Sequence, residues 1–417
     1  MPQASPKQGG FFCKILIFTL VMKHPFTFIL GLLLSVTMMT ICCHRASTSA
    51  TLQLPVINIQ TDSEILWDKR TPCSVMFLHN GDSLELSGKI KFRGGISSKY
   101  PKHSYSLKLK EEVSLCGLPS SKSWVLNASY IDKTFMRHKL CYDLFRMMGE
   151  YNMAPQCSYA LVSENGSPQG LYVVMQRLNK QSLHVNAHDS AAVIFKDPKV
   201  FFADSVMPQR SLSKLNYHEQ TYPDFDKYGD RSSIVEELHR FILCASNEQF
   251  ASEIGTWIDM RNVLDWHLLL LFTNGGDGVR KNFYLYKQNA SSPFRIALWD
   301  CDHSLGRDGD NELNMLKTLP DDHRNILFDR LLRQEWYLEK MKERWKQLRE
   351  SGIISYQNIE KMIAENDVLV KAGLSENSKL WPCDSEFYYD SNDYNQEKAL
   401  ILEFVRLSLD KMDERFR

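Results

Sequence analysis

The chain has 417 residues, of which 43% are apolar, 11% are aromatic and 24% are charged. This composition supplies enough apolar side chains for a core and excludes a chain that is disordered throughout. The 50 basic and 50 acidic residues give a formal net charge of zero. This balance argues against a nucleic-acid-binding protein, which usually carries a basic excess or a basic stripe.

The N-terminus is predicted to be a targeting segment. Lys23 precedes an apolar run at residues 26–43, which is the pattern of an export signal. Three kinds of targeting segment are compatible with this pattern. They are a lipoprotein leader attached through one of the two cysteines ending this run, a signal peptide cleaved after Ala50, and a single membrane-spanning anchor. We therefore expect an exported protein, secreted or attached to the cell envelope, with residues 1–50 as leader and tether.

One α+β domain is expected over residues 51–417, since no long linker or internal repeat follows the leader. Its first part, about residues 51–196, is predicted to be β-rich because apolar and polar residues alternate in short segments. The expected strands are residues 54–59, 87–92, 104–109, 158–162, 170–176 and 192–196. An Asn165-Gly166 pair predicts a hairpin turn, and residues 133–148 have the apolar spacing of a helix ending at Gly149.

The second part, about residues 230–417, is predicted to be mainly helical. The expected helices are residues 232–245, 259–272, 324–350, 355–371 and 394–414. The helix that starts at Asp259, a favourable N-cap residue, becomes apolar on all sides and should be buried. The polar insertion at residues 197–230 has no pattern that assigns it a structure.

Residues 277–306 carry the most informative pattern of the chain. Asn282 stands five residues after Asp277, and a predicted hairpin at residues 282–298 then leads to Asp300 and Asp302. Kinase-like sites divide their work in this way: one Asp orients the substrate hydroxyl, while an Asn and a second Asp hold Mg²⁺ on the ATP phosphates. Mg²⁺ prefers such hard oxygen ligands. The hairpin would bring both acidic ends to the same side of a sheet.

These residues also carry a family resemblance. Trp299-Asp-Cys-Asp-His-Ser-Leu-Gly306 resembles the Trp-Asp-x-Asp-x-x-x-Gly signature of the CotH (spore coat protein H) kinase family. Four further motifs match in the same order, from about residue 53 to the C-terminus. They are Arg93-Gly-Gly-Ile-Ser-Ser98 with Lys102 and Lys108, Asp132-Lys-Thr-Phe-Met-Arg137, Gly170-Leu-Tyr172, and Tyr217-His-Glu-Gln-Thr-Tyr-Pro223.

The resemblance implies an atypical protein-kinase-like fold, with a β-rich N-terminal lobe and a mainly helical C-terminal portion. It implies transfer of the ATP γ-phosphate to Ser or Thr of secreted or surface proteins, with Mg²⁺ and ATP as cofactors. The implied roles are a catalytic Asp277, metal ligands Asn282, Asp300 and Asp302, and nucleotide contacts Arg93, Lys102, Lys108 and Gln176. Arg137 is expected to pair with Asp132 or to reach the nucleotide.

Each of these roles has a structural alternative. Asp277 could be a turn residue without a catalytic role. Asp300 and Asp302 could accept hydrogen bonds from backbone amides or from Arg307. Most lysines are exposed on protein surfaces and have no specific function.

Two departures leave activity open. Gly95 stands where the family usually has Asn, and Gln176 stands where it usually has Glu. A neutral Gln would weaken an ion pair that positions a nucleotide lysine, and exported compartments contain little ATP. The first alternative is therefore a non-catalytic surface or structural protein that uses the fold as a binding module. The second is a metal-dependent enzyme of another reaction on the same scaffold, for example nucleotidyl rather than phosphoryl transfer.

Overall fold

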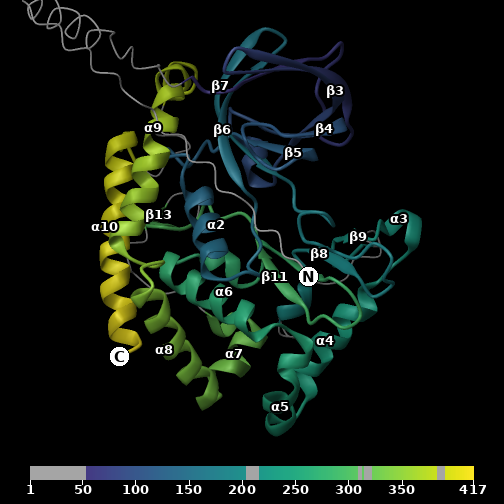
Figure 1. Ribbon diagram of the computed structural model, residues 1–417, viewed down its shortest axis with the longest axis vertical. Coiled ribbons are helices and arrows are strands. Elements are labelled where there is room, and N and C mark those ends of the chain that lie inside the picture. The colour runs from purple at the N-terminus through teal and green to yellow at the C-terminus, as the bar shows by residue number, and fades with distance from the viewer. Residues whose placement is uncertain (1–52, 203–215, 309–311, 314–321, 383–389) are drawn as a thin grey trace, which may run out of the picture. The chain divides into compact units, whose positions relative to one another are not determined.

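The computed structural model describes residues 53–202, 216–308, 312–313, 322–382 and 390–417, so the expected leader at residues 1–50 lies outside them. Gln53–Arg417 form one compact unit that combines strands and helices, as expected of an α+β domain (Figure 1). Among the described residues, no helix has both the length and the apolar character needed to cross a bilayer.

A closed barrel forms the N-terminal part of the described chain, with the strand order β1-β2-β3-β4-β5-β7-β6. Its strands are β1 (Val56–Gln60), β2 (Thr71–His79), β3 (Asp82–Arg93), β4 (Ser104–Val113), β5 (Ser121–Asn127), β6 (Cys157–Glu164) and β7 (Ser167–Gln176). Alternate residues point inward, where Trp124 and Tyr172 are fully buried in an apolar cluster. The predicted Asn165-Gly166 turn joins β6 and β7, but β2 and β5 were not predicted.

A second sheet follows, with the strand order β11-β10-β8-β9. Its strands are β8 (Val193–Lys196), β9 (Gln220–Tyr222), β10 (Phe283–Lys287) and β11 (Arg295–Leu298). The predicted hairpin is confirmed, since Phe283 pairs with Leu298 in an antiparallel register. The strand β8, the last of the expected β-rich part, pairs with β10 rather than with a barrel strand.

The helix α6 (Met260–Thr273) lies at the centre of the remaining structure, as predicted. Asp259 caps it by accepting from the backbone N–H groups of Arg261 and Asn262, and every residue from Asn262 to Thr273 is buried. It contacts α2 (Arg137–Met148), α8 (Glu335–Glu350), α10 (Tyr394–Arg415) and β11. This packing connects the helices to the strand that leads into Asp300.

The other helices differ from prediction mainly at their ends. The expected helix at 324–350 is two helices, α7 (Ile326–Leu332) and α8, because the backbone at Gln334 is extended. The helix α9 (Tyr356–Leu380) runs beyond the expected end at 371, and α5 (Asn247–Trp257) was not predicted.

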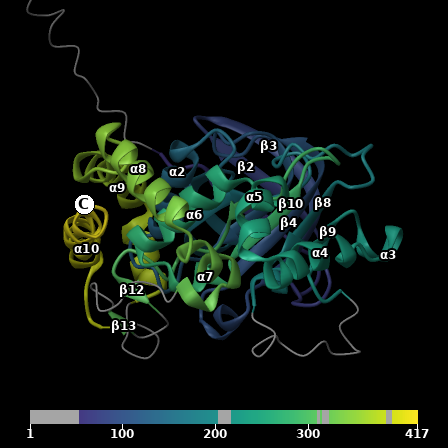
Figure 2. The same ribbon diagram turned by 90° about the horizontal axis from the view of Figure 1, so that it is seen from below.

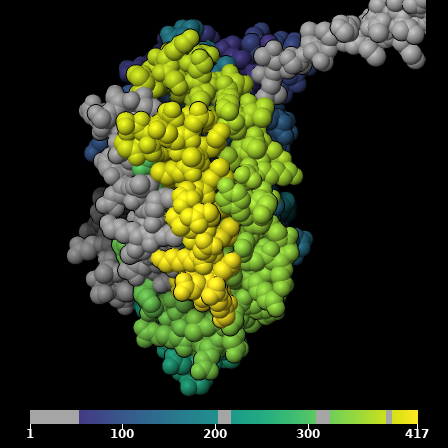
Figure 3. Space-filling view, turned by 90° about the vertical axis from the view of Figure 1, so that its left-hand side faces the viewer, coloured from purple at the N-terminus to yellow at the C-terminus, as the bar shows by residue number. Residues whose placement is uncertain are grey.

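The helices α4 (Ser232–Cys244) and α3 (Phe225–Tyr228) lie near the second sheet (Figure 2). Figure 3 shows α10 running along α9 on one face.

Candidate functional site

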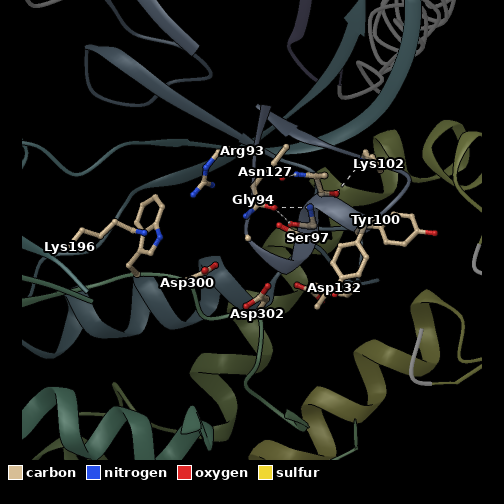
Figure 4. A pocket seen from close by; sticks show the side chains of 17 residues that line it. Arg93, Gly94, Ser97, Tyr100, Lys102, Asn127, Asp132, Lys196, Asp300 and Asp302 are labelled. Carbon is tan, nitrogen blue, oxygen red and sulfur yellow. Dashed lines mark hydrogen bonds between the residues drawn. The ribbon is translucent and has the colours of Figure 1, made fainter. Parts of the chain in front are cut away.

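A cavity of about 400 Å³ lies at the end of β3 and β4, above the loop that follows β11 (Figure 4). Its upper wall comes from the Arg93–Tyr100 loop, and a side wall comes from the β5–α2 connection at Asn127–Asp132. Lys196 of β8 closes the opposite side, and Trp299, Asp300 and Asp302 form its floor. Segments far apart in the sequence therefore meet here.

The floor is a backbone segment with an unusual conformation. Asp300 has a φ of 57°, and its backbone N–H donates to the Tyr142 hydroxyl across 2.8 Å. Further along, the Leu305 N–H donates to the Thr273 carbonyl across 2.8 Å, at the end of α6. A positive φ costs free energy for any residue but glycine, and such residues cluster at functional sites. The loop thus holds Asp300 in a conformation that the surrounding bonds must stabilise.

Asn282 stabilises the same loop from the other end of the hairpin. Its φ is 63°, and its side-chain amide donates to the Asp300 carbonyl across 3.1 Å. Asp197, at the end of β8, accepts from the backbone N–H groups of Asn282 and Phe283 across 2.6 and 3.2 Å. The hairpin thus places Asn282 beside Asp300, and the Asn282 amide bonds a backbone carbonyl here.

Asp300 and Asp302 on the floor lie close to His138, which does not itself line the cavity. Ligand atoms of His138, Asp300 and Asp302 all lie within 4.8 Å of one another. His138 Nδ1 accepts from the Cys301 backbone N–H across 3.0 Å, so Nε2 is the nitrogen that faces Asp300, 3.9 Å from its Oδ1. Sequence reasoning missed His138, although it directly follows Arg137 of the matched motif.

The electrostatics of the floor favour a bound cation. The pKa of Asp300 is raised, because protein atoms displace water from the carboxyl and because Asp302 places a second negative charge beside it. His138, Arg93 and Lys196 oppose this shift but do not outweigh it. A divalent cation between the two carboxylates would remove the repulsion.

The upper wall has the opposite charge. The Arg93 guanidinium lies over the Trp299 ring, 5.5 Å from its centroid. Lys196, on the side wall, adds a second positive charge and pairs with Asp197 across 3.1 Å. A side chain on Gly94 would lie 2.4 Å from Ser97 Oγ, and its φ is 145°, so this position requires glycine. Sequence reasoning identified Arg93 but missed Lys196, which looks like any lysine at a strand end.

Asp277 lies in the short helix η4 (Gly276–Val279), beyond the floor. Its carboxylate pairs with the Lys281 ammonium across 2.9 Å, and its side chain is 37% exposed. With Asp300 and Ser304 it lines a crevice of about 10 Å³ that adjoins the loop from below. The structure thus brings Asp277 beside the Asp300 loop without placing it in the cavity wall.

The two lysines predicted to contact the nucleotide occupy different environments. Lys102 reaches the cavity wall but is 2% exposed, and its ammonium donates to the carbonyls of Ala128 and Leu171 and to Asn377 Oδ1. Three bonds use all three of its hydrogens, and burial lowers its pKa well below the usual value. Lys108 is exposed on the outer face of β4 and lines a separate groove.

Gln176 also lies outside the cavity wall. Its side-chain amide donates to the Pro119 carbonyl at the far end of β5 and β7. The replacement of the family's Glu therefore changes no charge on the cavity wall. Gly95 does line the cavity, and no atom lies within 4 Å of the position that a Cβ would take there.

The comparisons agree with the motifs. The family model described as CotH kinase protein matches residues 90–410. The inner spore coat protein H of Bacillus subtilis strain 168 is 26% identical over 247 residues, which are 58% of this chain and 65% of that protein. An inner spore coat protein H-like protein of the same organism is 27% identical over 171 residues, 41% of this chain and 45% of that protein. The chain thus spans less than two thirds of either relative's length.

Proposed function

The chain belongs to the CotH kinase protein family, and we propose that it is an exported atypical kinase. In this proposal it has a kinase-like fold and transfers the γ-phosphate of ATP to a Ser or Thr hydroxyl of a secreted or surface protein. The observation that best supports this proposal is the cavity of about 400 Å³, which has basic side chains on its walls and acidic side chains on its floor. Arg93 and Lys196 suit the phosphates of a nucleotide, while Asp300 and Asp302 suit the cation that accompanies them.

The residues present fit a magnesium ion. Asp300 and Asp302 offer the carboxylate oxygens that Mg²⁺ prefers. The pKa of Asp300 is raised first by loss of water and then by repulsion from Asp302, and a cation would relieve this repulsion. When bound, the ion would neutralise charge on the phosphate oxygens. His138 would not be a ligand in this arrangement, because its Nδ1 accepts from the Cys301 N–H and its Nε2 therefore carries the hydrogen.

The other residues would position the reactants. The indole of Trp299 is 4% exposed and packs beneath the Arg93 guanidinium, which it supports at the cavity. Backbone N–H groups of the Gly94–Ser98 loop can bind phosphate oxygens, since Gly94 keeps the loop tight. Asp277, beside the loop, would orient the substrate hydroxyl and accept its proton once its pair with Lys281 opens.

Nucleotide binding by the purified protein tests the proposal. Calorimetry should detect ATP binding that requires Mg²⁺. Asp302→Ala should abolish the metal dependence, whereas Asp277→Ala should preserve binding and stop transfer to a serine-rich acceptor. ATP labelled at the γ-phosphate should label the acceptor, and ATP labelled at the α-phosphate should not. Label from the α-phosphate would instead indicate nucleotidyl transfer.

A wild-type protein that binds no nucleotide at any Mg²⁺ concentration would overturn the kinase proposal. The same scaffold would then be a non-catalytic binding module of a surface or structural protein.

A further inference from the structure

A buried network of charged side chains lies behind the floor of the cavity. Its members are Asp132, Arg137, Arg307, Asp390 and Glu397, from three separate regions of the chain. All except Asp390 are at most 2% exposed. Charges are buried at a cost, so a network of this size requires close pairing among its members.

Glu397 of α10 is the acceptor that two arginines share. Arg137 donates from NH2 to Glu397 Oε2 across 3.1 Å. Arg307 donates to both oxygens of the same carboxylate, from Nε to Oε2 across 3.3 Å and from NH2 to Oε1. Burial opposes ionisation of Glu397, but the two guanidiniums outweigh it and lower the pKa of this carboxyl.

Both arginines are attached to the loop that carries Asp300 and Asp302. Arg137 donates from Nε to the Ser304 carbonyl across 3.1 Å, in the middle of that loop. Arg307 is the residue directly after Gly306, where the loop ends. Glu397, 90 residues further along the chain, thus connects the loop to the C-terminal helix at two points.

The network also reaches the cavity wall. Arg137 donates from NH1 to Asp132 Oδ1 across 2.7 Å, and Asp132 lines the cavity. Without the negative charge of Glu397, two guanidiniums that converge on one point would repel each other in a buried environment. Movement of the loop would separate them, because both arginines are anchors of the loop.

We propose that Glu397 is a positioning residue for the metal site: it holds Arg137 and Arg307, and through them the loop that presents Asp300 and Asp302. This inference rests on the proposed function and extends it to a residue of α10 that touches neither nucleotide nor metal. Groups that orient metal ligands from behind commonly affect metal affinity or activity by roughly 10- to 100-fold.

Glu397→Gln, which preserves the shape and removes the charge, tests this role. The matched control is Asp367→Asn on α9, a carboxylate that pairs with Lys371 and Lys398 and accepts from the Tyr394 hydroxyl, all on α9 and α10. Both substitutions remove one paired carboxylate from a contact of α10, Glu397 toward Arg137 and Arg307 and Asp367 toward Lys398. Only Glu397 contacts groups attached to the Asp300 loop, so the two variants separate positioning from general loss of stability.

Two measurements decide the outcome. In Glu397→Gln, the Mg²⁺ concentration for half-maximal ATP binding should rise roughly 10- to 100-fold, with little change in ATP affinity at saturating Mg²⁺. Hydrogen exchange should quicken in peptides covering residues 300–307. Asp367→Asn should leave both measurements at wild-type values. Equal behaviour of the two variants would overturn the proposal.

Folding and function can be told apart. If Glu397→Gln does not fold, Arg307→Lys replaces it, since it keeps the positive charge but loses the paired donation to both oxygens of Glu397. It should quicken exchange in the peptides covering residues 300–307 in the same way, and unchanged exchange would refute the role. If wild type binds no nucleotide, the kinase proposal fails, while the exchange comparison still decides whether Glu397 holds the loop.

Discussion

The side-chain amide of Asn282 donates to the backbone carbonyl of Asp300 across 3.1 Å, and both residues have a positive φ, of 63° and 57°. They stand at the open ends of the β10–β11 hairpin, where Trp299 N–H also donates to the Asn282 carbonyl across 3.2 Å. The hairpin therefore ends in two strained residues that stabilise each other. Asn and Asp tolerate this conformation better than other residues with a Cβ.

Substitution of Asn282 separates its conformational role from its hydrogen bond. Asn282→Gly suits the positive φ, whereas Asn282→Ala does not, so the alanine variant should be less stable than the glycine variant by about 1 kcal/mol in urea unfolding. Both lose the amide that holds Asp300, so both should weaken Mg²⁺-dependent ATP binding. Equal stability of the two variants would contradict the left-handed conformation at this position.

The two lysines of the matched N-terminal motif should behave differently. Lys102→Met leaves the carbonyls of Ala128 and Leu171 and the amide of Asn377 without their buried donor, and should lower the free energy of unfolding by about 2–4 kcal/mol. Lys108→Met, on an exposed face, should change it by less than about 0.5 kcal/mol. Denaturant unfolding measures both. A stable Lys102→Met variant that has lost ATP binding would instead support the nucleotide role.

Acid should weaken the contact between α9 and α10 through Asp367. Burial opposes its ionisation, but Lys371, Lys398 and Tyr394 lower the pKa of this carboxyl to about 2. A depressed folded-state pKa stabilises the protein above the unfolded value near ~3.9, and this contribution disappears as the pH falls toward ~2. Wild type should exceed Asp367→Asn in stability by about 1–2 kcal/mol at pH 6, with the gap closing near pH 2. A constant gap across that range would contradict the assignment.

Export predicts a processed N-terminus. Both the lipoprotein and the cleaved signal peptide would remove residues 1–41, because the apolar run at residues 26–43 is the targeting element. Intact mass of the protein from its native envelope measures this directly. Leu33→Arg places a charge in the run, which costs about 2.5–3.5 kcal/mol on insertion, and should block export. Native protein that retains residues 1–41 would refute this form of the proposal.

Features that depend on neighbours in the sequence were predictable. The Asn165-Gly166 turn, the Asp259 cap and the β10–β11 hairpin all arise from local conformational preferences, and the structure contains each of them. The break between α7 and α8 was missed because the charged segment around Gln334 carries no proline or glycine to indicate it. The helix α9 is longer than predicted because Gly373, a residue typical of helix ends, lies inside it.

The roles of individual charged residues depended on burial, which local pattern does not reveal. Lys102 and Lys108 stand in the same motif, yet one is an interior donor and the other is exposed. His138 and Lys196 join the site only because α2 and β8 pack against the loop after β11.

The sequence alone determined the family, the α+β class and the placement of Asn282, Asp300 and Asp302 at one end of a hairpin. These features depend on the order of motifs and on pairing between residues that are close in the sequence. Only the tertiary structure decided which basic side chains lie near those carboxylates and which are hydrogen-bonded in the protein interior. It also decided that Glu397, on the last helix, lies behind the loop. The physical reason is that a charge acts through its distance to other charges and its separation from water, and long-range packing sets both.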